Sequence, residues 1–276
     1  MKLNYIFGLV VFLSLWSCKE RETEKGIREV AKAISTDLQV DHFNIWVENP
    51  KLAKERLNDI GFTSVPDSLS QIHKGQGTTG RYFHFFNGYL ELIFVYDQSE
   101  LEENNRINRD LDFTERANFE ENGASPFSIA LKVKDYNVEK IPFEKVRYHQ
   151  EWMGEDVSIY SAKHSKTHLK APSVFVVYPE IESEQFETLA DLQKIPDEYA
   201  FAREFYKHPN GAKKITNITI TSTAINLNTA SMQAVNSIEN LIVKNGAEHL
   251  MELYFDENIQ GKSFDLRPEL PLKIYL

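Results

Sequence analysis

Cysteine is almost absent from this 276-residue chain, which contains only Cys18. A single cysteine cannot form a disulfide framework, so a buried hydrophobic core has to stabilise the fold. The chain also lacks a phosphate-loop spacing and a nucleophile-elbow serine, which disfavours nucleotide binding and serine hydrolase chemistry. Basic residues are outnumbered, with 31 Lys and Arg against 41 Asp and Glu and a formal net charge of −10. This charge disfavours nucleic acid as a partner.

Long hydrophobic runs are missing as well. The apolar run at Tyr5–Leu15 is shorter than the roughly 20 residues that a membrane-spanning helix needs. Leu15-Trp16-Ser17-Cys18 follows it, and the whole segment resembles a bacterial lipoprotein signal with its lipobox. In such signals the peptide is cut before the cysteine, and the cysteine is then lipidated. An ordinary secretory signal with a chance cysteine is the alternative.

The resemblance implies a signal peptide at residues 1–17 and a lipidated Cys18 that begins a charged tether at residues 18–37. The protein is then expected on the cell envelope, held to a membrane through its lipid. Lys19 follows the cysteine, where an Asp would favour retention in the inner membrane. We therefore expect the outer membrane of a Gram-negative bacterium.

Alternation of apolar and polar residues and strong turn signals predict a β-α-β-β-β unit near the start of the mature chain. Asn49-Pro50 has the residue types of a helix start, and Asn87-Gly88 those of a tight hairpin. The predicted elements are a strand at 40–47, a helix from Asn49-Pro50 to Gly61, strands at 62–65, 81–86 and 89–96, and a loop at 66–79.

Further elements follow less regularly. We expect helix in 99–122 and short helical pieces at 186–194 and 198–206, whereas 142–152 has no clear pattern. Middle-region strands are predicted at 127–134, 157–162 and 174–178. A second strand–helix–strand pattern closes the chain, with strands at 215–222, 249–256 and 272–276. Its helix is predicted to begin at Asn228, to end at Asn245-Gly246, and to carry the stripe Met232, Val235, Ile238, Leu241 and Ile242.

Five stretches in this order resemble the vicinal-oxygen-chelate superfamily, and within it the glyoxalase-like domain proteins. They are VDHFNIWV at 40–47, HKGQGTTGRYFHFFNGYLELIFV at 73–95, GASPFSIAL at 123–131, HPNGAKKITNITI at 208–220 and FDLRPELPLKIYL at 264–276. The resemblance implies an α+β fold in which paired βαβββ modules form curved mixed sheets around a cleft. The domain would span 38–276, with a first module at 38–97, a middle region at 98–207 and a terminal module at 208–276.

Metal-using members of the superfamily take a His from the first strand of a module and a Glu from its last strand. His42 and Glu91 match these positions, and both alternate with apolar neighbours, so each could project into the cleft. Together they could bind a divalent metal such as Zn, Mn, Fe or Ni. A structural hydrogen-bonded or ionic pair is the alternative. A metal site normally needs a third ligand, and His84 is the candidate.

The other half of such a site is not apparent in the sequence. In the terminal module the matching positions hold Asn217 and Lys273 or Tyr275, and the middle region offers Ser128 and Glu180. A lysine cannot hold a cation, so no complete ligand set is visible.

Three more residues are candidate ligand-binding groups. Trp46 shares the polar face of its strand with His42, Tyr82 belongs to an aromatic strand pair that could line a pocket, and His73 opens a glycine-containing loop. The sequence thus favours an envelope protein that binds a small oxygen-bearing molecule in an aromatic cleft. Metal-assisted lyase, isomerase or dioxygenase chemistry is implied by the resemblance, with His84 as an acid–base residue. A binding module without metal and a surface lipoprotein that binds a protein or a glycan are the alternatives.

Overall fold

The computed structural model describes residues 37–177 and 185–276. The predicted signal peptide, Cys18 and almost all of the tether lie outside the described residues, as does Glu180. In the part of the chain that is described, no helix is both long and apolar enough to cross a membrane.

The first module contains one helix and four strands. They are β1 (Leu38–Trp46), α2 (Pro50–Asp59), β2 (Ile72–His73), β3 (Thr78–Phe85) and β4 (Gly88–Val95), with a 3₁₀ turn, η1, at Asp67–Leu69. The Asn49 side chain accepts a hydrogen bond from Leu52 N–H, as expected for a helix N-cap. The β3–β4 hairpin turns at Phe86-Asn87, one residue before the predicted Asn87-Gly88, because Gly88 already pairs with Phe85. The predicted β-α-β-β-β order is therefore present.

One strand of this unit was predicted in the wrong place. Residues 62–65 form no strand, because only Val65 N–H bonds to Tyr82 O and Pro66 has no N–H to continue the ladder. The remaining strand is instead β2, which lies inside the predicted loop 66–79 and pairs with the start of β3.

The middle region contains a second module. Three short helices lead into it rather than the helix expected at 99–122: α3 (Gln98–Ile107), α4 (Phe113–Ala117) and α5 (Phe119–Asn122). Helix α3 ends at Asn108, and α5 ends at the left-handed Gly123. The module consists of β5 (Phe127–Val133), the 3₁₀ turns η2 (Lys134–Tyr136) and η3 (Val138–Lys140), β6 (Lys145–Tyr148), β7 (Ile159–Ala162), η4 (Lys163–Lys166) and β8 (Ser173–Val176).

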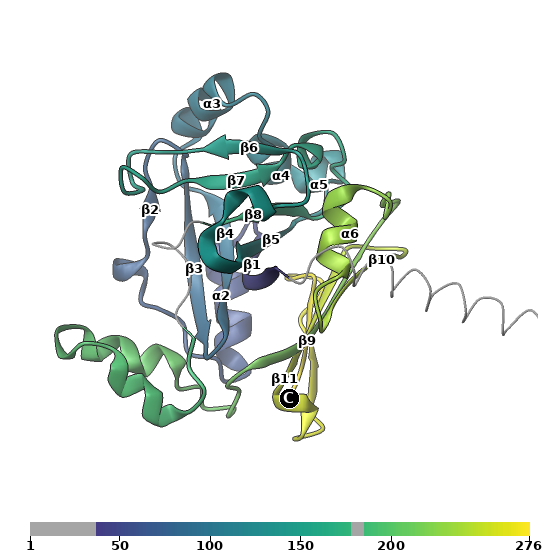
Figure 1. Cartoon of the computed structure of the whole chain (residues 1–276). Coiled ribbons are helices and arrows are strands. Elements are labelled where there is room, and N and C mark those ends of the chain that lie inside the picture. The colour runs from purple at the N-terminus through teal and green to yellow at the C-terminus, as the bar shows by residue number, and fades with distance from the viewer. Residues whose placement is uncertain (1–36, 178–184) are drawn as a thin grey trace, which may run out of the picture.

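The two modules join into one eight-stranded sheet with the order β2-β3-β4-β1-β5-β8-β7-β6 (Figure 1). The order is symmetric about the β1–β5 junction, because β1 is parallel to β4, β5 is parallel to β8, and β1 is antiparallel to β5. The first module therefore pairs with the middle region, and the terminal segment builds a sheet of its own.

The terminal segment follows two 3₁₀ pieces, η6 (Leu189–Lys194) and η7 (Asp197–Tyr206), close to the predicted helical positions. It contains β9 (Ile215–Ser222), α6 (Ala230–Asn236), β10 (Leu241–Asn245), β11 (Leu250–Phe255), η8 (Asp256–Asn258), β12 (Ser263–Asp265) and β13 (Leu272–Tyr275). The sheet order β12-β13-β11-β9-β10 has the same sequence of parallel and antiparallel pairings as β3-β4-β1-β5-β8.

The helix predicted here was too long. Thr229, not Asn228, caps α6, and the helix stops at Asn236, whose side chain bonds to both backbone groups of Val243. Leu241 and Ile242 of the predicted helical stripe belong to β10. The apolar spacing of residues 238–242 is compatible with both helix and strand. The two hydrogen bonds between the Asn236 side chain and the Val243 backbone favour the strand.

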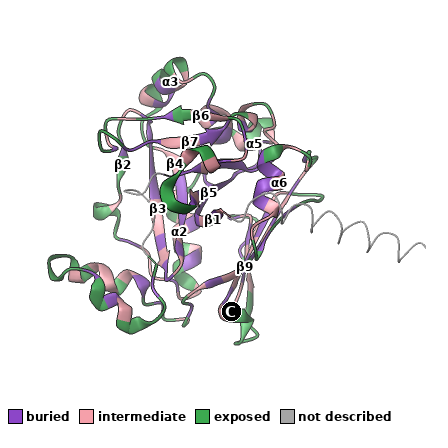
Figure 2. Ribbon diagram, in the orientation of Figure 1, coloured by how far each residue is buried: buried purple, intermediate pink, exposed green. Residues whose placement is uncertain are grey.

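The two sheets pack against a shared hydrophobic core (Figure 2). Phe43 and Leu92 of the large sheet and Leu253 and Ile274 of the small one are buried in it. The mixed, curved sheets confirm the α+β fold that the resemblance implied. Because one face of the eight-stranded sheet is used by this core, its other face is left to form a cavity.

Candidate functional site

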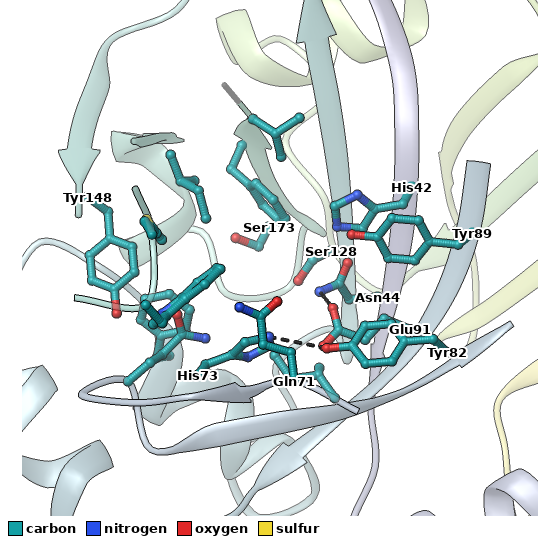
Figure 3. A pocket seen from close by; sticks show the side chains of 18 of the residues that line it. His42, Asn44, Gln71, His73, Tyr82, Tyr89, Glu91, Ser128, Tyr148 and Ser173 are labelled. Atoms are coloured by element: carbon teal, nitrogen blue, oxygen red, sulfur yellow. Dashed lines mark hydrogen bonds between the residues drawn. The ribbon is translucent and has the colours of Figure 1, made fainter. Parts of the chain in front are cut away.

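A cavity of about 740 Å³ lies against the other face of the eight-stranded sheet, and both modules line it. Six predicted site residues line this one cavity: His42, Trp46, His73, Tyr82, His84 and Glu91. Figure 3 shows four of them around it, His42, His73, Tyr82 and Glu91. Their placement agrees with the strand alternation, while their roles stay predictions.

A row of hydrogen-bonding side chains crosses the centre of the sheet. Strand register places Asn44 opposite Glu91 on one side and opposite Ser128 on the other, and Ser128 opposite Ser173. One residue of the row comes from each of β4, β1, β5 and β8. His42 lies outside this row, opposite Tyr89. The neighbour of Glu91 on β1 is therefore Asn44, a residue to which the sequence reasoning gave no role.

His42 has its own partners. Its Nδ1 lies 2.5 Å from Asp41 Oδ1, and its ring stacks on Tyr89 with centroids 4.1 Å apart. The β1 strand has an irregularity between Val40 and His42. Asp41 and His42 are both buried. The imidazole is thus held by a carboxylate and an aromatic ring, and Glu91 makes its hydrogen bond elsewhere.

Glu91 is a buried carboxyl with one hydrogen bond of ordinary geometry, which its Oε2 accepts from Asn44 Nδ2 at 2.7 Å. Its Oε1 has no such partner. Burial raises the pKa of Glu91 to about 8, and the nearby Tyr82 hydroxyl opposes this rise. Glu91 therefore keeps its proton at neutral pH.

Gly80 makes room for this carboxyl. A Cβ atom at Gly80 would lie 2.4 Å from Glu91 Oε1 and 2.8 Å from the ring of Tyr82. Any other residue on this position of β3 would have to displace one of the two side chains. The position of Glu91 thus depends on the absence of a side chain on the neighbouring strand.

A chain of polar groups leads from Glu91 to the loop that follows β2. The Tyr82 hydroxyl lies 3.2 Å from His73 Nε2, and His73 Nδ1 lies 3.0 Å from Thr78 Oγ1. Gln76 Nε2 donates to the same threonine oxygen at 2.8 Å. Burial, with a smaller contribution from the His42 charge, lowers the pKa of His73 to about 4, so this imidazole is neutral.

The loop at 73–78 packs against its neighbours. Gly75 N–H donates to Glu100 Oε2, and Gly77 O accepts from Tyr96 N–H. A Cβ atom at Gly77 would lie 2.3 Å from the backbone nitrogen of Leu101. Because the Gly75 N–H already bonds to a carboxylate, the loop does not have the free donors of an anion-binding nest.

His84 lies at another part of the cavity wall, opposite Tyr89 in the β3–β4 register. Its ring packs between Tyr89 and Tyr206, with centroid distances of 5.4 and 5.3 Å. Burial lowers the pKa of His84 to about 4, and the charges of His208 and His42 act in the same direction. The residue is a neutral wall group that makes aromatic contacts.

The predicted metal site does not fit these donors. Within 37–177 and 185–276, no three His, Cys, Asp or Glu side chains gather closely enough to hold an ion. The central row offers one carboxyl, one amide and two hydroxyls, and a carboxyl has to lose its proton to ligate a metal. Asn217, Lys273 and Tyr275 lie on the terminal sheet and line no part of the cavity.

A buried ion pair closes the second-module side of the cavity. Arg116 Nε donates to Asp112 Oδ2 at 2.7 Å, and both residues are buried. The Arg116 guanidinium also donates to four carbonyl oxygens, those of Ser125, Ser165, Leu169 and Ala171. The i, i+4 spacing of Asp112 and Arg116 could have indicated the pair, but not its burial.

Comparison with known proteins agrees with this architecture. A family model described as a glyoxalase-like domain matches residues 40–235. No curated protein matches the chain.

Three solved structures align with the chain at low sequence identity. A hypothetical protein from Staphylococcus aureus has a TM-score of 0.48 and 11% identity, covering 86% of this chain and 98% of its own. A hypothetical protein from Bacillus halodurans C-125 has a TM-score of 0.36 and 11% identity, covering 55% and 99%. Methylmalonyl-CoA epimerase from Mycobacterium tuberculosis has a TM-score of 0.34 and 14% identity, covering 57% and 93%.

Proposed function

The chain belongs to the glyoxalase-like domain family, and from this premise we propose that it is a lipid-anchored envelope protein that binds a small oxygen-bearing molecule in the cavity between its two modules. The observation that carries the proposal is the buried polar row on an otherwise largely apolar and aromatic cavity wall. Asn44 Oδ1 has no hydrogen-bond partner, and Glu91 keeps a proton to share. Unpaired buried polar atoms in a cavity favour a ligand that pairs them.

The cavity's own residues supply both kinds of contact in this proposal. Trp46, Trp152 and Phe175 offer flat apolar surfaces, while Asn44 and Ser128 offer hydrogen-bonding atoms at the centre of the floor. In the family, a divalent metal would polarise the oxygens of a substrate. Here the donor set does not fit a metal, so the polar row itself would orient the ligand.

Binding can be tested on the soluble chain from Glu20 onward with a panel of small fragments and ligand-observed NMR. Ser128→Trp places a large ring on the cavity floor, and Ile259→Trp adds the same ring at a site that is 80% exposed. We expect a set of fragments that bind the native chain and Ile259→Trp but not Ser128→Trp. If no fragment is lost in Ser128→Trp, the cavity is not the binding site.

Metal content is measured on the same protein. We expect neither stoichiometric Zn, Mn, Fe or Ni after purification nor an increase in melting temperature when these ions are added. A bound metal that disappears in both His42→Ala and Glu91→Ala would instead favour metal-assisted lyase, isomerase or dioxygenase chemistry.

Proton transfer without a metal is a second candidate function, favoured by one observation. The raised pKa of Glu91, about 8, lies close to neutral pH, where a carboxyl can both give and take a proton. The test is exchange of carbon-bound protons in bound fragments for deuterium in heavy water. Exchange that native protein catalyses and Glu91→Gln does not would support this function, and equal exchange rates would reject it.

The lipid anchor has a separate test. Cys18→Ser removes the acceptor of the lipid, so the variant should leave the membrane fraction when it is expressed in cells that process bacterial lipoproteins. Native protein is the control. A Cys18→Ser variant that stays with the membranes would reject the anchor.

A further inference from the structure

Each charged side chain among the described lining residues of the cavity is already paired with other groups of the protein. Asp112 and Arg116 form an ion pair, and the remaining guanidinium hydrogen bonds of Arg116 go to four backbone carbonyls. No lysine lines the cavity. An anionic ligand would therefore find no free cation among the described lining residues.

Among the described residues that line the cavity, a cationic ligand would find no free carboxylate either. Glu91 keeps its proton at neutral pH, and Asp112 accepts hydrogen bonds from Arg116 and from Ser173. The lining imidazoles do not supply charge, because burial keeps His73 and His84 neutral and His42 is paired with Asp41. Burying an ion without a counter-charge costs several kcal/mol, which disfavours charged ligands of either sign.

Asn44 adds a requirement to this neutral cavity. In the structure, Asn44 Nδ2 donates to Glu91 Oε2, which places the carboxyl proton on Oε1 and turns Asn44 Oδ1 the other way. Oδ1 is buried and has no hydrogen-bond partner within residues 37–177 and 185–276, and the whole residue is 6% exposed. Figure 3 shows Asn44 on the cavity floor between Ser128 and Glu91. An unpaired buried acceptor calls for a donor.

We infer that the molecule bound in this cavity is uncharged and presents an O–H or N–H donor to Asn44 Oδ1. The inference rests on the proposed function, because it names the chemical class of ligand for the same cavity. Alcohols and primary amides have this chemistry, whereas carboxylates, phosphates, ammonium ions and simple esters do not.

The first measurement is the charge of the panel fragments that lose binding in Ser128→Trp, at pH 7. Neutral fragments with a donor should dominate these cavity-specific binders relative to their share of the panel. Anionic or cationic fragments in the majority would overturn the inference while leaving cavity binding itself intact. Absence of any cavity-specific fragment would overturn the proposed function, and the inference with it.

A second measurement compares three probes that share one ring: benzamide, methyl benzoate and benzoate. Benzamide is neutral and has a donor, methyl benzoate is neutral without one, and benzoate is an anion. In native protein we expect benzamide to bind about 5-fold more tightly than methyl benzoate, the effect of one hydrogen bond, and at least 10-fold more tightly than benzoate. Equal or tighter binding of benzoate in the cavity would contradict the neutral character.

Variants assign the donor contact to Asn44. Asn44→Leu should remove the preference for benzamide over methyl benzoate. Gln71→Leu changes the same amide to the same apolar side chain at another position lining the cavity, and should keep the preference. If Asn44→Leu keeps it, or if native protein shows none, the donor requirement is wrong. The probe comparison on native protein holds even if Asn44→Leu does not fold.

Discussion

The two modules that form the large sheet have the same strand pairing but place different functional groups on their cavity faces. The first contributes a carboxyl, an amide and a phenol, from Glu91, Asn44 and Tyr82. The corresponding row positions of the second module are Ser128 and Ser173. Backbone symmetry therefore does not produce a symmetric site, and ligand recognition is expected mostly on the first module.

The two modules also differ in how they hold their buried polar groups. The Asp112–Arg116 pair fastens the second-module side through carbonyls at 125, 165, 169 and 171. The first module has the buried Asp41–His42 pair, but its Glu91 is held by a hydrogen bond from Asn44 and by the missing Cβ at Gly80. The stability of the second module should thus depend on the Asp112–Arg116 ion pair, whereas the position of Glu91 in the first module should depend on close packing.

The largest loss of stability is expected for Arg116→Met. Removing the guanidinium takes the counter-charge from the buried Asp112 carboxylate and one hydrogen bond from each of four carbonyls, which should cost about 3–5 kcal/mol of unfolding free energy. Arg106→Met is the matched control, because Arg106 pairs with Glu103 on the exposed surface, and its loss should leave the unfolding free energy almost unchanged. Urea denaturation measures both, and similar losses would contradict the assigned role of burial.

Gly80→Ala should have the next largest effect. The added methyl group has to displace Glu91 Oε1 or the Tyr82 ring, a strain of about 1–3 kcal/mol. Gly154→Ala also adds a methyl group beside the cavity, but its nearest neighbour would be Val157 Cγ2 at 3.4 Å. Thermal melts should separate the two variants, and an undisturbed Gly80→Ala would mean that Glu91 lies elsewhere.

Glu91→Gln tests the protonated carboxyl through the pH dependence of stability. A folded-state pKa of about 8 for Glu91, above the ordinary value of 4.5, means that the folded protein binds more protons than the unfolded chain between these pH values. Native stability should therefore fall relative to Glu91→Gln as pH rises from 4.5 to 8, by at most about 1.4 kcal/mol per pH unit.

The histidines with lowered pKa act in the opposite direction, but they are present in both proteins and cancel in this difference. Urea denaturation at several pH values measures it. A difference that is constant over the window would show that Glu91 is ionised there and that the carboxyl is better solvated than the structure indicates.

The smallest effect is expected for Ser128→Ala. The Ser128 hydroxyl makes none of the hydrogen bonds described above, so its removal should change the unfolding free energy by less than about 0.5 kcal/mol. Tyr82→Phe on the first module removes a hydroxyl that meets His73 Nε2 and should cost about 1 kcal/mol. Equal losses from the two substitutions would remove the contrast between the modules.

Local sequence signals predicted most of the first module but not the pairing of modules. The residue types at Asn49 and Asn87-Gly88 act within a few residues, so the helix start was predicted correctly and the hairpin turn to within one residue. The assignment of residues 228–245 to one helix was wrong, because Asn236 binds Val243 through contacts that spacing does not reveal. The strand predicted at 62–65 was also wrong, because only Val65 bonds to Tyr82 O and Pro66 has no N–H to extend the ladder.

In the candidate site, too, local sequence signals predicted some features and contacts between distant segments decided others. Alternation correctly directed His42, Trp46, Tyr82 and Glu91 toward one face, and all of them line the cavity. It could not determine that Asn44, rather than His42, lies beside Glu91, because register between distant strands decides this pairing. Neither could it show that Gly80 accommodates the carboxyl or that Arg116 is buried.

By itself, the amino-acid sequence determined the helix start and three of the four strands of the first module, the acidic charge and the face on which the candidate residues lie, because these depend on neighbours close in the chain. Only the tertiary structure decided that the first module pairs with the middle region, that the row across the floor consists of Glu91, Asn44, Ser128 and Ser173, and that burial raises the pKa of the Glu91 carboxyl. These features come from strand register and burial, which arise when segments far apart in the chain meet and exclude water.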